Sequence, residues 1–576
     1  MAVELQGLVG SPGVGIGKIW VFKPAELTIN RHPITDIEKE IIALTNAQKK
    51  VEHYLQSIYQ SVLESQRKEE AEIFEGHIEL LWDEDLIEET HNVIKTEKKS
   101  ASAAIADYLD EVIEDMRSLA DEYMRERAAE FIDLRKNILL ALNNQDFASL
   151  SDVPDGTIIA AQDLTPTDTA QLNKNKVRGF ILEKGGSTSH VAILARNLEI
   201  PAVMGVANLL NHVQNGQPVV IDGDDGTAVI EPSHAVLELY KQKQEKQNKI
   251  RAEYAELKYE PALTKDKFLV NLYSNIGSPN DIEIVEKFGA EGVGLFRTEF
   301  LFMETQKAPT EEEQAAAYIQ VAKALGRTPL ILRLVDIGGD KPLPYLNFPE
   351  EENPFLGWRG IRIYQENIDI FITQIRAVLR ASLYGDIRIM VPMVISVDEI
   401  VWVRAELNKQ AELLRKEGYD VKDIHLGVMI ETPAAALISP QIAKHSDFFS
   451  IGTNDLTQYT LAVDRGNQKI SGLYDSLHPA LIRLMKITVD AAKDYNREVG
   501  VCGELGGHLP AIPILVGLGF DDLSISGGML PFVKGLIRKL DKSKCAALVD
   551  DVLRVNNAQE VRALIKNWSA ENNIEI

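Results

Sequence analysis

Residues 262–576 contain eight short runs of strand-forming residues, and sequence with helical character separates each run from the next. This alternation constrains the fold more than any other feature, because strands that alternate with helices form a parallel sheet. Eight such β/α units in a segment of this length predict a (β/α)8 TIM barrel. The runs lie at 268–273, 292–296, 330–335, 387–391, 426–430, 448–451, 499–502 and 523–526.

Polar and charged side chains follow these runs, at the places where a TIM barrel forms its active site. The carboxyl ends of all eight strands meet at one rim, so we expect these side chains to converge. They are Arg297, Asp336, Glu431, Asn454, Asp455 and Cys502, with Arg333 inside the third run. The sequence therefore predicts one polar site at this rim.

A long helical block precedes the barrel region. Thr35 and Glu38 have the spacing of a capping box. Apolar residues then recur every three or four positions from Ile37 to Val62, with Gln48 in the one polar place. Acidic sequence of the same helical character continues to about residue 142. This spacing predicts an all-α bundle.

Short β-branched runs on both sides of the helical block indicate an α/β unit that the block interrupts. They lie at 16–22 before the block, and at 156–160, 177–182 and 218–223 after it. We expect the N-terminal strand to complete this unit. Residues 235–259 contain neither Gly nor Pro and are rich in strong helix formers, so they predict a helical linker. At about 1.5 Å per residue it is roughly 35 to 40 Å long.

Charge and cysteine content argue against several classes of protein. The chain has 61 basic and 86 acidic residues and a formal net charge of −25 at pH 7. That charge disfavours binding to nucleic acid or anionic membranes and favours a basic protein partner. The two cysteines, Cys502 and Cys545, indicate neither a disulfide framework nor a paired-cysteine zinc site, and a reducing, cytoplasmic location fits. The longest nearly apolar stretch, 509–520, is too short for a membrane span, and we expect no secretory leader in residues 1–17.

His190 follows a glycine pair and three hydroxyl residues and begins a helical segment. Backbone amides and hydroxyls at a helix start suit an anion. Neutral imidazole keeps a nitrogen lone pair for attack on phosphorus, so His190 is a candidate nucleophile toward a phosphoryl group. Glycine–serine turns before helices are common, and a structural or helix-capping histidine is the alternative.

The arginines predicted at the barrel rim point to an anionic substrate. They are Arg297, Arg333, Arg359 and Arg465. Their guanidinium forks match a small substrate that has both carboxylate and phosphate groups. Glu431 and Asp455 are hard oxygen donors after the fifth and sixth strands, which suits a Mg²⁺ ion. Taken singly, each arginine is better explained by a surface salt bridge and each carboxylate by a helix cap; their joint placement after successive strands favours the site.

Cys502 comes at the end of the seventh predicted strand. A thiol at that position is able to donate a proton or act as a nucleophile. A single buried cysteine also serves as a small apolar side chain, so both interpretations stay open. Cys545 has no comparable context, and we assign it no role.

Nine motifs in order along the chain resemble enzyme I of the bacterial sugar phosphotransferase system, the phosphoenolpyruvate-protein phosphotransferase family. They cover 73–77, 163–166, 185–190, 291–300, 336–341, 353–359, 431–433, 452–459 and 502–504. Several are long, such as EGVGLFRTEF at 291–300 and GTNDLTQY at 452–459. The resemblance is therefore specific, and it covers essentially the whole chain.

The resemblance implies that His190 accepts the phosphoryl group of phosphoenolpyruvate and passes it to a histidine of the small carrier protein HPr, with release of pyruvate. Thr169 matches a position that hydrogen-bonds the active histidine, and Cys502 matches the residue that protonates the enolpyruvate carbon. Mg²⁺ is implied at Glu431 and Asp455. The residues implied to hold phosphoenolpyruvate are Arg297, Arg333, Arg359, Asn454, Asp455 and Arg465.

For the fold, the resemblance implies an α/β multidomain chain in which a swivelling phosphohistidine domain carries the inserted helical bundle. The phosphohistidine domain would comprise 1–24 and 146–232, the HPr-binding helical domain 33–145, the helical linker 233–261, and the phosphoenolpyruvate-binding barrel 262–576. The barrel is also the expected homodimerisation domain.

Four positions in the N-terminal half bear on how the resemblance is interpreted. Glu75, His77 and Asp83 match the HPr-docking region, where we interpret His77 as structural or as a partner contact and not as catalytic. Ser187 stands where some relatives have arginine, which bears on the rate of the reaction more than on its nature.

Two alternatives remain. Pyruvate phosphate dikinases and phosphoenolpyruvate synthases share a swivelling histidine domain and a barrel, but they have a large nucleotide-binding domain for which this chain lacks the length. A non-catalytic regulatory protein that keeps the fold and binds partners through its acidic helices predicts the loss of rim residues, and those named above are present.

Overall fold

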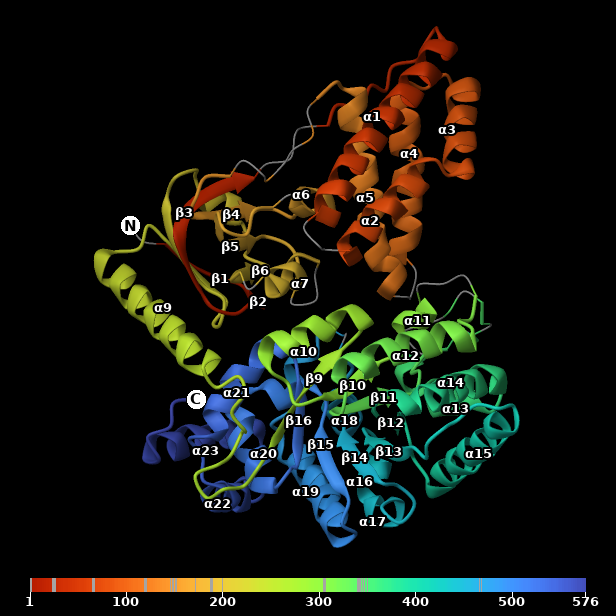
Figure 1. The fold of residues 1–576 in the computed structure, drawn as a ribbon. Helices are drawn as coiled ribbons and strands as arrows, with labels where there is room; N and C mark the ends of the chain where they lie inside the picture. Colours follow the sequence, from red (N-terminus) through yellow and green to blue (C-terminus); the bar gives the residue numbers. More distant parts are fainter. Residues whose placement is uncertain are drawn as a thin grey trace. The chain divides into compact units, whose positions relative to one another are not determined.

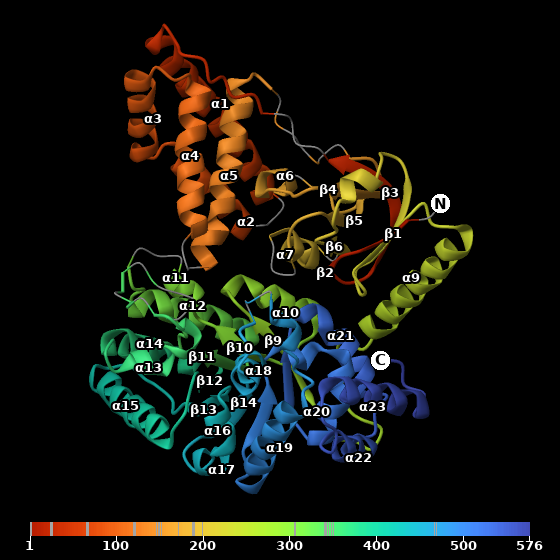
Figure 2. The same cartoon turned by 180° about the vertical axis from the view of Figure 1, so that it is seen from behind.

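The computed structural model describes residues 3–22, 27–64, 68–118, 122–145, 147, 150, 153–170, 172–186, 190–198, 200–303, 307–338, 343, 345–346, 348–349, 351–465, 467 and 469–576. The chain divides into two compact units, Met1–Lys249 and Ile250–Ile576. Figures 1 and 2 show both units from opposite sides. Among the described residues, none of the helices combines the length and the apolar character that crossing a membrane requires.

The first unit contains a mixed sheet of eight described strands that come from both ends of its sequence. The strands are β1 (Val3–Gln6), β2 (Leu8–Ser11), β3 (Val14–Phe22), β4 (Thr157–Ala161), β5 (Val177–Leu182), β6 (Ala202–Met204), β7 (Pro218–Asp222) and β8 (Thr227–Ile230). Their order in the sheet is β1-β8-β7-β3-β4-β5-β6-β2. β3 pairs parallel with β4 and antiparallel with β7, which confirms that the N-terminal strand completes the α/β unit.

Short helices connect the strands of this sheet, and a long one follows its last strand. They are α6 (Pro166–Ala170), α7 (His190–Asn197), α8 (Leu209–His212) and the long α9 (His234–Ala255). The last of these confirms the predicted helical linker. Lys243 of α9 forms a 2.5 Å ion pair with Asp222 of β7, and Gln244 donates to the carbonyl of Val14 at 2.8 Å. The first part of α9 is therefore anchored to the sheet.

The helical block folds as a bundle between β3 and β4 in the sequence. Its helices are α1 (Ile37–Glu64), α2 (Lys68–Leu81), α3 (Glu84–Glu97), α4 (Ala101–Ser118) and α5 (Glu122–Leu142). On α1 the predicted apolar positions from Leu44 to Val62 are fully buried, and Gln48 between them donates to the carbonyl of Leu81 at 3.0 Å. The capping bond comes from Asp36, which accepts from Lys39 N at 3.1 Å, one residue after the predicted Thr35.

The second unit contains a closed barrel of eight described parallel strands, which confirms the predicted TIM barrel. The strands are β9 (Asn271–Ile276), β10 (Val293–Arg297), β11 (Pro329–Arg333), β12 (Asp386–Val391), β13 (His425–Ile430), β14 (Phe448–Ile451), β15 (Glu498–Val501) and β16 (Asp522–Ile525). The first strand begins three residues later than predicted. Its apolar start belongs to a turn below the barrel, where Leu269 bridges to Leu263 and Val270 N donates to Ala262 O at 3.1 Å.

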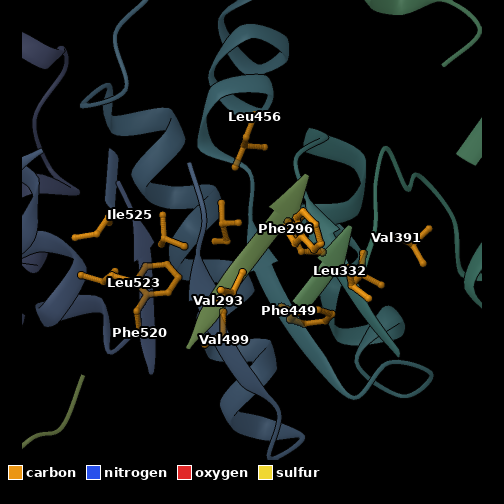
Figure 3. Close-up of a cluster of buried hydrophobic side chains, with 14 of the residues drawn as sticks. Val293, Phe296, Leu332, Val391, Phe449, Leu456, Val499, Phe520, Leu523 and Ile525 are labelled. Atoms are coloured by element: carbon orange, nitrogen blue, oxygen red, sulfur yellow. The ribbon is translucent and has the colours of Figure 1, made fainter. Parts of the chain in front are cut away.

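Helices surround the barrel and bury the outward faces of its strands. They are α10 (Ile282–Phe288), α11 (Phe300–Met303), α12 (Glu311–Leu325), α13 (Ile361–Tyr364), α14 (Ile368–Ala381), α15 (Val397–Lys416), α16 (Pro433–Leu437), α17 (Ser439–Ile442), α18 (Thr453–Leu461), α19 (Pro479–Asp494), α20 (Ile512–Leu518), α21 (Leu530–Ile537), α22 (Lys542–Val552) and α23 (Ala558–Glu571). Figure 3 shows part of this apolar layer, including Phe296, Leu332 and Phe449. Since side chains alternate along a strand, the neighbours of these residues point into the barrel.

The inside of the barrel is apolar in its middle and polar at the carboxyl ends of the strands. A separate buried cluster fills the interior with Leu295, Ile331, Met390, Met429, Phe448 and Cys502. Two residues further along β10 and β11, the same inward face presents Arg297 and Arg333. The polar rim therefore stands on an apolar floor, which lowers the local dielectric and strengthens charge interactions there.

Candidate active site

The structure brings most of the predicted rim residues together in one buried cluster. Arg333 ends β11, Asp336 follows it, and Glu431 and Asp455 follow β13 and β14. Arg359 reaches the cluster from the loop before α13. All five side chains are buried. The convergence that the strand positions predicted is thus realised for these residues.

Arg333 is held in place by two carboxylates. Its Nη2 lies 2.9 Å from Glu299 Oε1, and its Nη1 lies 3.4 Å from Asp336 Oδ2. Burial opposes its charge, but Glu299, Asp336 and Glu431 raise the pKa of Arg333 overall. Its Nε is buried and has no hydrogen-bond partner among the described residues. The group is therefore a fixed cation with bonding capacity left for a ligand.

Arg359 forms a two-point ion pair with Asp336. Its Nε and Nη2 lie 3.2 Å and 2.7 Å from the two carboxylate oxygens. Nη2 also lies 3.6 Å from Asp455 Oδ2, and Nη1 donates to the Tyr459 hydroxyl at 3.2 Å. Burial disfavours the charge, whereas Asp336 and Asp455 raise the pKa of Arg359. Asp336 thus links both buried guanidinium groups in a rigid arrangement.

Glu431 and Asp455 carry more negative charge than their surroundings compensate. Burial, together with the nearby charges of Asp455 and Asp336, raises the pKa of Glu431 well above its usual range. Glu431 accepts from Met393 N at 2.6 Å, whereas Asp455 Oδ1 is buried without a hydrogen-bond partner in the described part of the chain. A divalent cation would satisfy both the unpaired oxygen and the excess charge. The donor set therefore fits a hard cation.

The protein supplies only part of a coordination sphere at this point. Among the described residues, no cluster of three or more His, Cys, Asp or Glu side chains has the arrangement of a metal site. Mg²⁺ commonly takes one or two carboxylates and fills its other positions with substrate oxygens and water. Two carboxylates beside a cluster of arginines match that mode of binding.

Arg297 stands next to this cluster and borders a cavity of about 620 Å³. Partial loss of contact with water and the nearby Arg333 charge lower the pKa of Arg297. Two positive groups that repel each other in this way gain from an anion placed between them. Tyr474, Glu504 and His508 also line the cavity. Its volume is large enough for a small ligand.

Asn454 and Arg465 lie on the same rim but outside the buried cluster. Asn454 exchanges hydrogen bonds with Glu504, to its side chain at 3.3 Å and from its backbone N–H at 3.2 Å. Arg465 is exposed, and its guanidinium lies 5.9 Å from the centroid of the Phe355 ring. The contacts of both side chains are therefore separate from the buried cluster.

Cys502 follows β15 and is buried at the top of the apolar floor. Its Sγ lies 3.6 Å from the carbonyl oxygen of Ile451. Burial raises the pKa of the thiol to about 12, although Ser450, Arg333 and Arg297 act in the opposite direction. The group is therefore a protonated thiol at neutral pH, suited to donate a proton and poorly suited to act as a free nucleophile.

The structure also places three residues at the site that the sequence analysis did not single out. Glu299, two residues after β10, pairs with Arg333 and accepts from Asp336 N at 2.8 Å. Asn275 of β9 donates to the carbonyl of Cys502 at 3.1 Å and accepts from Ser524 Oγ at 2.7 Å. Side chains alternate between the inside and the outside of the barrel along β9 and β16. Correct strand ends would therefore have identified Asn275 and Ser524 as inward-facing residues.

His190 lies in the first unit, where it is the first residue of α7. Ser187 and the two residues after it lie outside the described residues. Thr169, in α6, is buried and donates to the carbonyl of Thr165 at 3.3 Å. Asp168 beside it accepts from the backbone and hydroxyl of Thr165 and forms a 2.5 Å ion pair with Lys136 of α5. The bundle therefore supports the turn that carries Thr169.

The three other residues singled out in the bundle have different environments. His77 is fully buried, with Nδ1 3.9 Å from Asp133 Oδ2 and its ring edge-on to Phe74. Asp83 caps α3 by accepting from Asp85 N and Leu86 N. Glu75 is exposed on α2. Burial gives His77 a structural role and leaves Glu75 and Asp83 on the surface.

Family models and the sequences of curated relatives identify one family for this chain. Residues 251–542 match the PEP-binding domain of PEP-utilising enzymes, 6–127 their N-terminal domain and 153–226 their mobile domain. The chain is 41% identical to the phosphoenolpyruvate-protein phosphotransferase of Priestia megaterium, over 98% of this chain and 99% of that protein. It is 42% identical to that of Geobacillus stearothermophilus, over 98% and 97%. A solution structure of Enzyme I (nEIt) covers 42% of this chain and 99% of its own, at 38% identity and a TM-score of 0.39.

Proposed function

The chain belongs to the phosphoenolpyruvate-protein phosphotransferases, and we propose that its reaction passes through His190. His190 takes the phosphoryl group from phosphoenolpyruvate and gives it to a histidine of HPr, and pyruvate is released. This is the first step of the sugar phosphotransferase system. The proposal joins two sites on separate units, a nucleophile at the start of α7 and an anion site on the barrel rim.

The observation that carries the proposal is the buried pair Arg333 and Arg359, which share Asp336 as an ion-pair partner. Beside them lie Glu431 and Asp455, whose negative charge is only partly compensated. Fixed guanidinium groups in a low-dielectric rim suit a small substrate that has both a carboxylate and a phosphate. Arg297, Asn454, Asp455 and Arg465 complete the proposed phosphoenolpyruvate site. Because Arg333 and Arg359 are held by carboxylates before substrate arrives, these two groups need little reorganisation on binding.

The proposed transfer breaks the bond between phosphorus and the enol oxygen and forms a bond from phosphorus to a His190 ring nitrogen. The arginines hold the phosphate and stabilise the charge that develops on the leaving enolate. Thr169 orients the imidazole by a hydrogen bond. Since His190 and the barrel belong to different units, the cycle requires movement of the unit that carries His190 between the barrel and HPr.

Mg²⁺ is the proposed cofactor, held by Glu431 and Asp455. When bound, it neutralises phosphate charge as phosphorus transfers. The unpaired Asp455 oxygen and the raised pKa of Glu431 support this assignment, since a bound cation would satisfy the oxygen and compensate the charge. The arginines and these carboxylates together would surround the phosphate with alternating charge.

We expect Mg²⁺ to stabilise the protein without any substrate, because a cation relieves the repulsion between Glu431 and Asp455. At ten times its Kd it should add about 1.4 kcal/mol, and the melting temperature should rise by about 2 °C. Glu431→Gln should lose this response while melting no lower than the parent in metal-free buffer, because a buried charge has been removed. Glu498→Gln, at the opposite end of the barrel, is the control. An equal Mg²⁺ response in Glu431→Gln and the parent would rule out this site.

Cys502 is the proposed proton donor to the enolpyruvate carbon. We expect Cys502→Ser to reduce pyruvate formation by about 10²-fold or more, because a hydroxyl is a weaker acid than a thiol. Phosphoenolpyruvate affinity should change less than about threefold. Coupled pyruvate assays and equilibrium binding separate the two effects. Cys545→Ser, which alters the other buried cysteine, should leave both unchanged; parent-like turnover in Cys502→Ser would remove the role.

We further propose the bounds and the function of each domain. Residues 1–24 and 146–232 form the phosphohistidine domain, 33–145 the HPr-binding domain, 233–261 the linker, and 262–576 the phosphoenolpyruvate-binding barrel through which the chain forms a homodimer. The exposed acidic groups of the bundle and the net charge of −25 suit a basic carrier protein. A cytoplasmic location is consistent with the same partners.

The decisive experiment incubates the protein with Mg²⁺ and radiolabelled phosphoenolpyruvate and then adds HPr. A protein-bound label that is acid-labile, alkali-stable and moves to HPr supports the proposal. Label from ATP and none from phosphoenolpyruvate would instead indicate a dikinase. HPr binding without label from either donor would indicate a regulatory protein.

A further inference from the structure

Asn275 links the first and last barrel strands to the segment that carries Cys502. It lies at the carboxyl end of β9, half-buried and on the inward face. Its Nδ2 donates to the backbone carbonyl of Cys502 at 3.1 Å, and its Oδ1 accepts from Ser524 Oγ at 2.7 Å. Ser524 is fully buried in β16. Three strands are thus joined through one amide side chain.

The chemistry of these partners fixes the orientation of the Asn275 amide. A backbone carbonyl only accepts hydrogen bonds, so the NH₂ end must face Cys502 and the oxygen must face Ser524. Gly294 leaves room for this arrangement, since a Cβ at that position would lie 2.6 Å from Ser524 Oγ. The amide therefore has one arrangement that satisfies both partners.

In the described part of the chain, the other contacts of Cys502 and Gly503 come from β14 and the start of α18, as in the 3.1 Å hydrogen bond from Cys502 N to Ile451 O. The next residue, Gly503, passes so close to Thr453 that a Cβ there would lie 2.0 Å from its Oγ1. The thiol itself hydrogen-bonds Ser450 and lies 3.6 Å from the carbonyl of Ile451. β14 thus supports the sulfur, whereas the link to β9 depends on Asn275.

We propose that Asn275, supported by Ser524, is a positioning residue that aims the Cys502 thiol at the enolpyruvate carbon. The inference rests on the proposed function and deepens it. In the proton transfer, the electron pair of the enolate double bond forms the new C–H bond at C3, the S–H bond breaks, and the thiolate regains its proton from water. Such a transfer requires donor and acceptor within about 3 Å, and a misplacement of about 1 Å slows reactions by about 10²-fold.

Water is close enough to compete when the thiol is misplaced. Asn275, Gly503 and Arg297 all line the cavity of about 620 Å³, so this side of Cys502 borders solvent-accessible space. A thiol held on one face of the enolate delivers its proton to that face only. An enolate that is protonated by water instead receives protons on both faces. The stereochemistry of the product therefore shows whether the thiol is correctly positioned.

The test uses (Z)-2-phosphoenolbutyrate in D₂O, whose protonation creates a stereocentre at C3, and the full-length protein with Mg²⁺ and HPr. The 2-oxobutyrate is trapped by enzymatic reduction, and the C3 configuration is read by NMR. We expect one configuration from the parent and a nearly equal mixture from Asn275→Ala, with turnover about tenfold lower. First-turnover labelling of the protein by phosphoenolpyruvate should change less than twofold.

Three further variants keep the result interpretable. Ser524→Ala should give an intermediate mixture, and it replaces Asn275→Ala if that variant fails to fold. Cys502→Ser should match or exceed the loss of selectivity, and Asn271→Ala, at the other end of β9, should retain it. Full selectivity and parent-like turnover in both Asn275→Ala and Ser524→Ala would overturn the inference. Absence of label in the parent itself would instead overturn the proposed function and this inference with it.

Discussion

Replacing His190 with alanine is expected to abolish transfer of label from phosphoenolpyruvate to the protein, and transfer to HPr with it. The loss should be at least about 10⁴-fold, as when an enzyme loses its nucleophile. Phosphoenolpyruvate binding should persist, because His190 belongs to the unit Met1–Lys249 while the arginines belong to Ile250–Ile576. Radiolabel transfer and equilibrium binding measure the two properties separately.

The matched control for this variant is His234→Ala. His234 is an exposed histidine of the same unit at the start of α9, so its loss should change neither labelling nor binding. Retained acid-labile label in His190→Ala would show that another residue accepts the phosphoryl group. Loss of phosphoenolpyruvate binding together with label would mean that His190 contributes to the substrate site and is not only the acceptor.

The barrel could be predicted from the sequence because each strand is a short apolar run with a helix after it. The first strand shows the limit of that reasoning. Phe268, Leu269 and Val270 are as apolar as a strand, yet Leu269 forms an antiparallel bridge to Leu263 below the barrel. Apolar character alone does not separate a barrel strand from a turn beside the barrel, since Leu269 is apolar and yet 45% exposed.

That displacement also bears on why Asn275 was missed in the sequence. With the first strand placed at 268–273, Asn275 lay beyond its end and was not considered as an inward-facing rim residue. Glu299 was missed for a different reason, because its partner Arg333 is 34 residues away and belongs to the neighbouring strand. Contacts between strands depend on register, which local patterns do not contain. Arg297, Glu431 and Asp455 were found because each lies at or after the end of its own strand.

Substitution of Arg333 is expected to separate two roles of this side chain, binding the substrate and compensating buried carboxylates. Arg333→Met removes the charge that Glu299 and Asp336 face at 2.9 Å and 3.4 Å, which should cost about 3–5 kcal/mol of unfolding free energy. Arg333→Lys keeps the charge but not the planar fork, so most of the stability should remain. Both variants should lower kcat/KM for phosphoenolpyruvate, by about 10³-fold for Arg333→Met and about 10²-fold for Arg333→Lys.

The double variant Arg333→Met with Glu299→Gln distinguishes these roles most sharply. Removing one of the unpaired carboxylates should recover part of the lost unfolding free energy, because Gln is neutral and nearly isosteric. It should recover none of the phosphoenolpyruvate transfer, since the guanidinium is still absent. Arg388→Met, which affects an arginine paired with Asp386 and Glu498 at the opposite end of the barrel, should leave transfer unchanged. Recovery of transfer in the double variant, or parent-like kcat/KM in Arg333→Lys, would mean that Arg333 only neutralises the carboxylates and that the substrate is held by the other arginines.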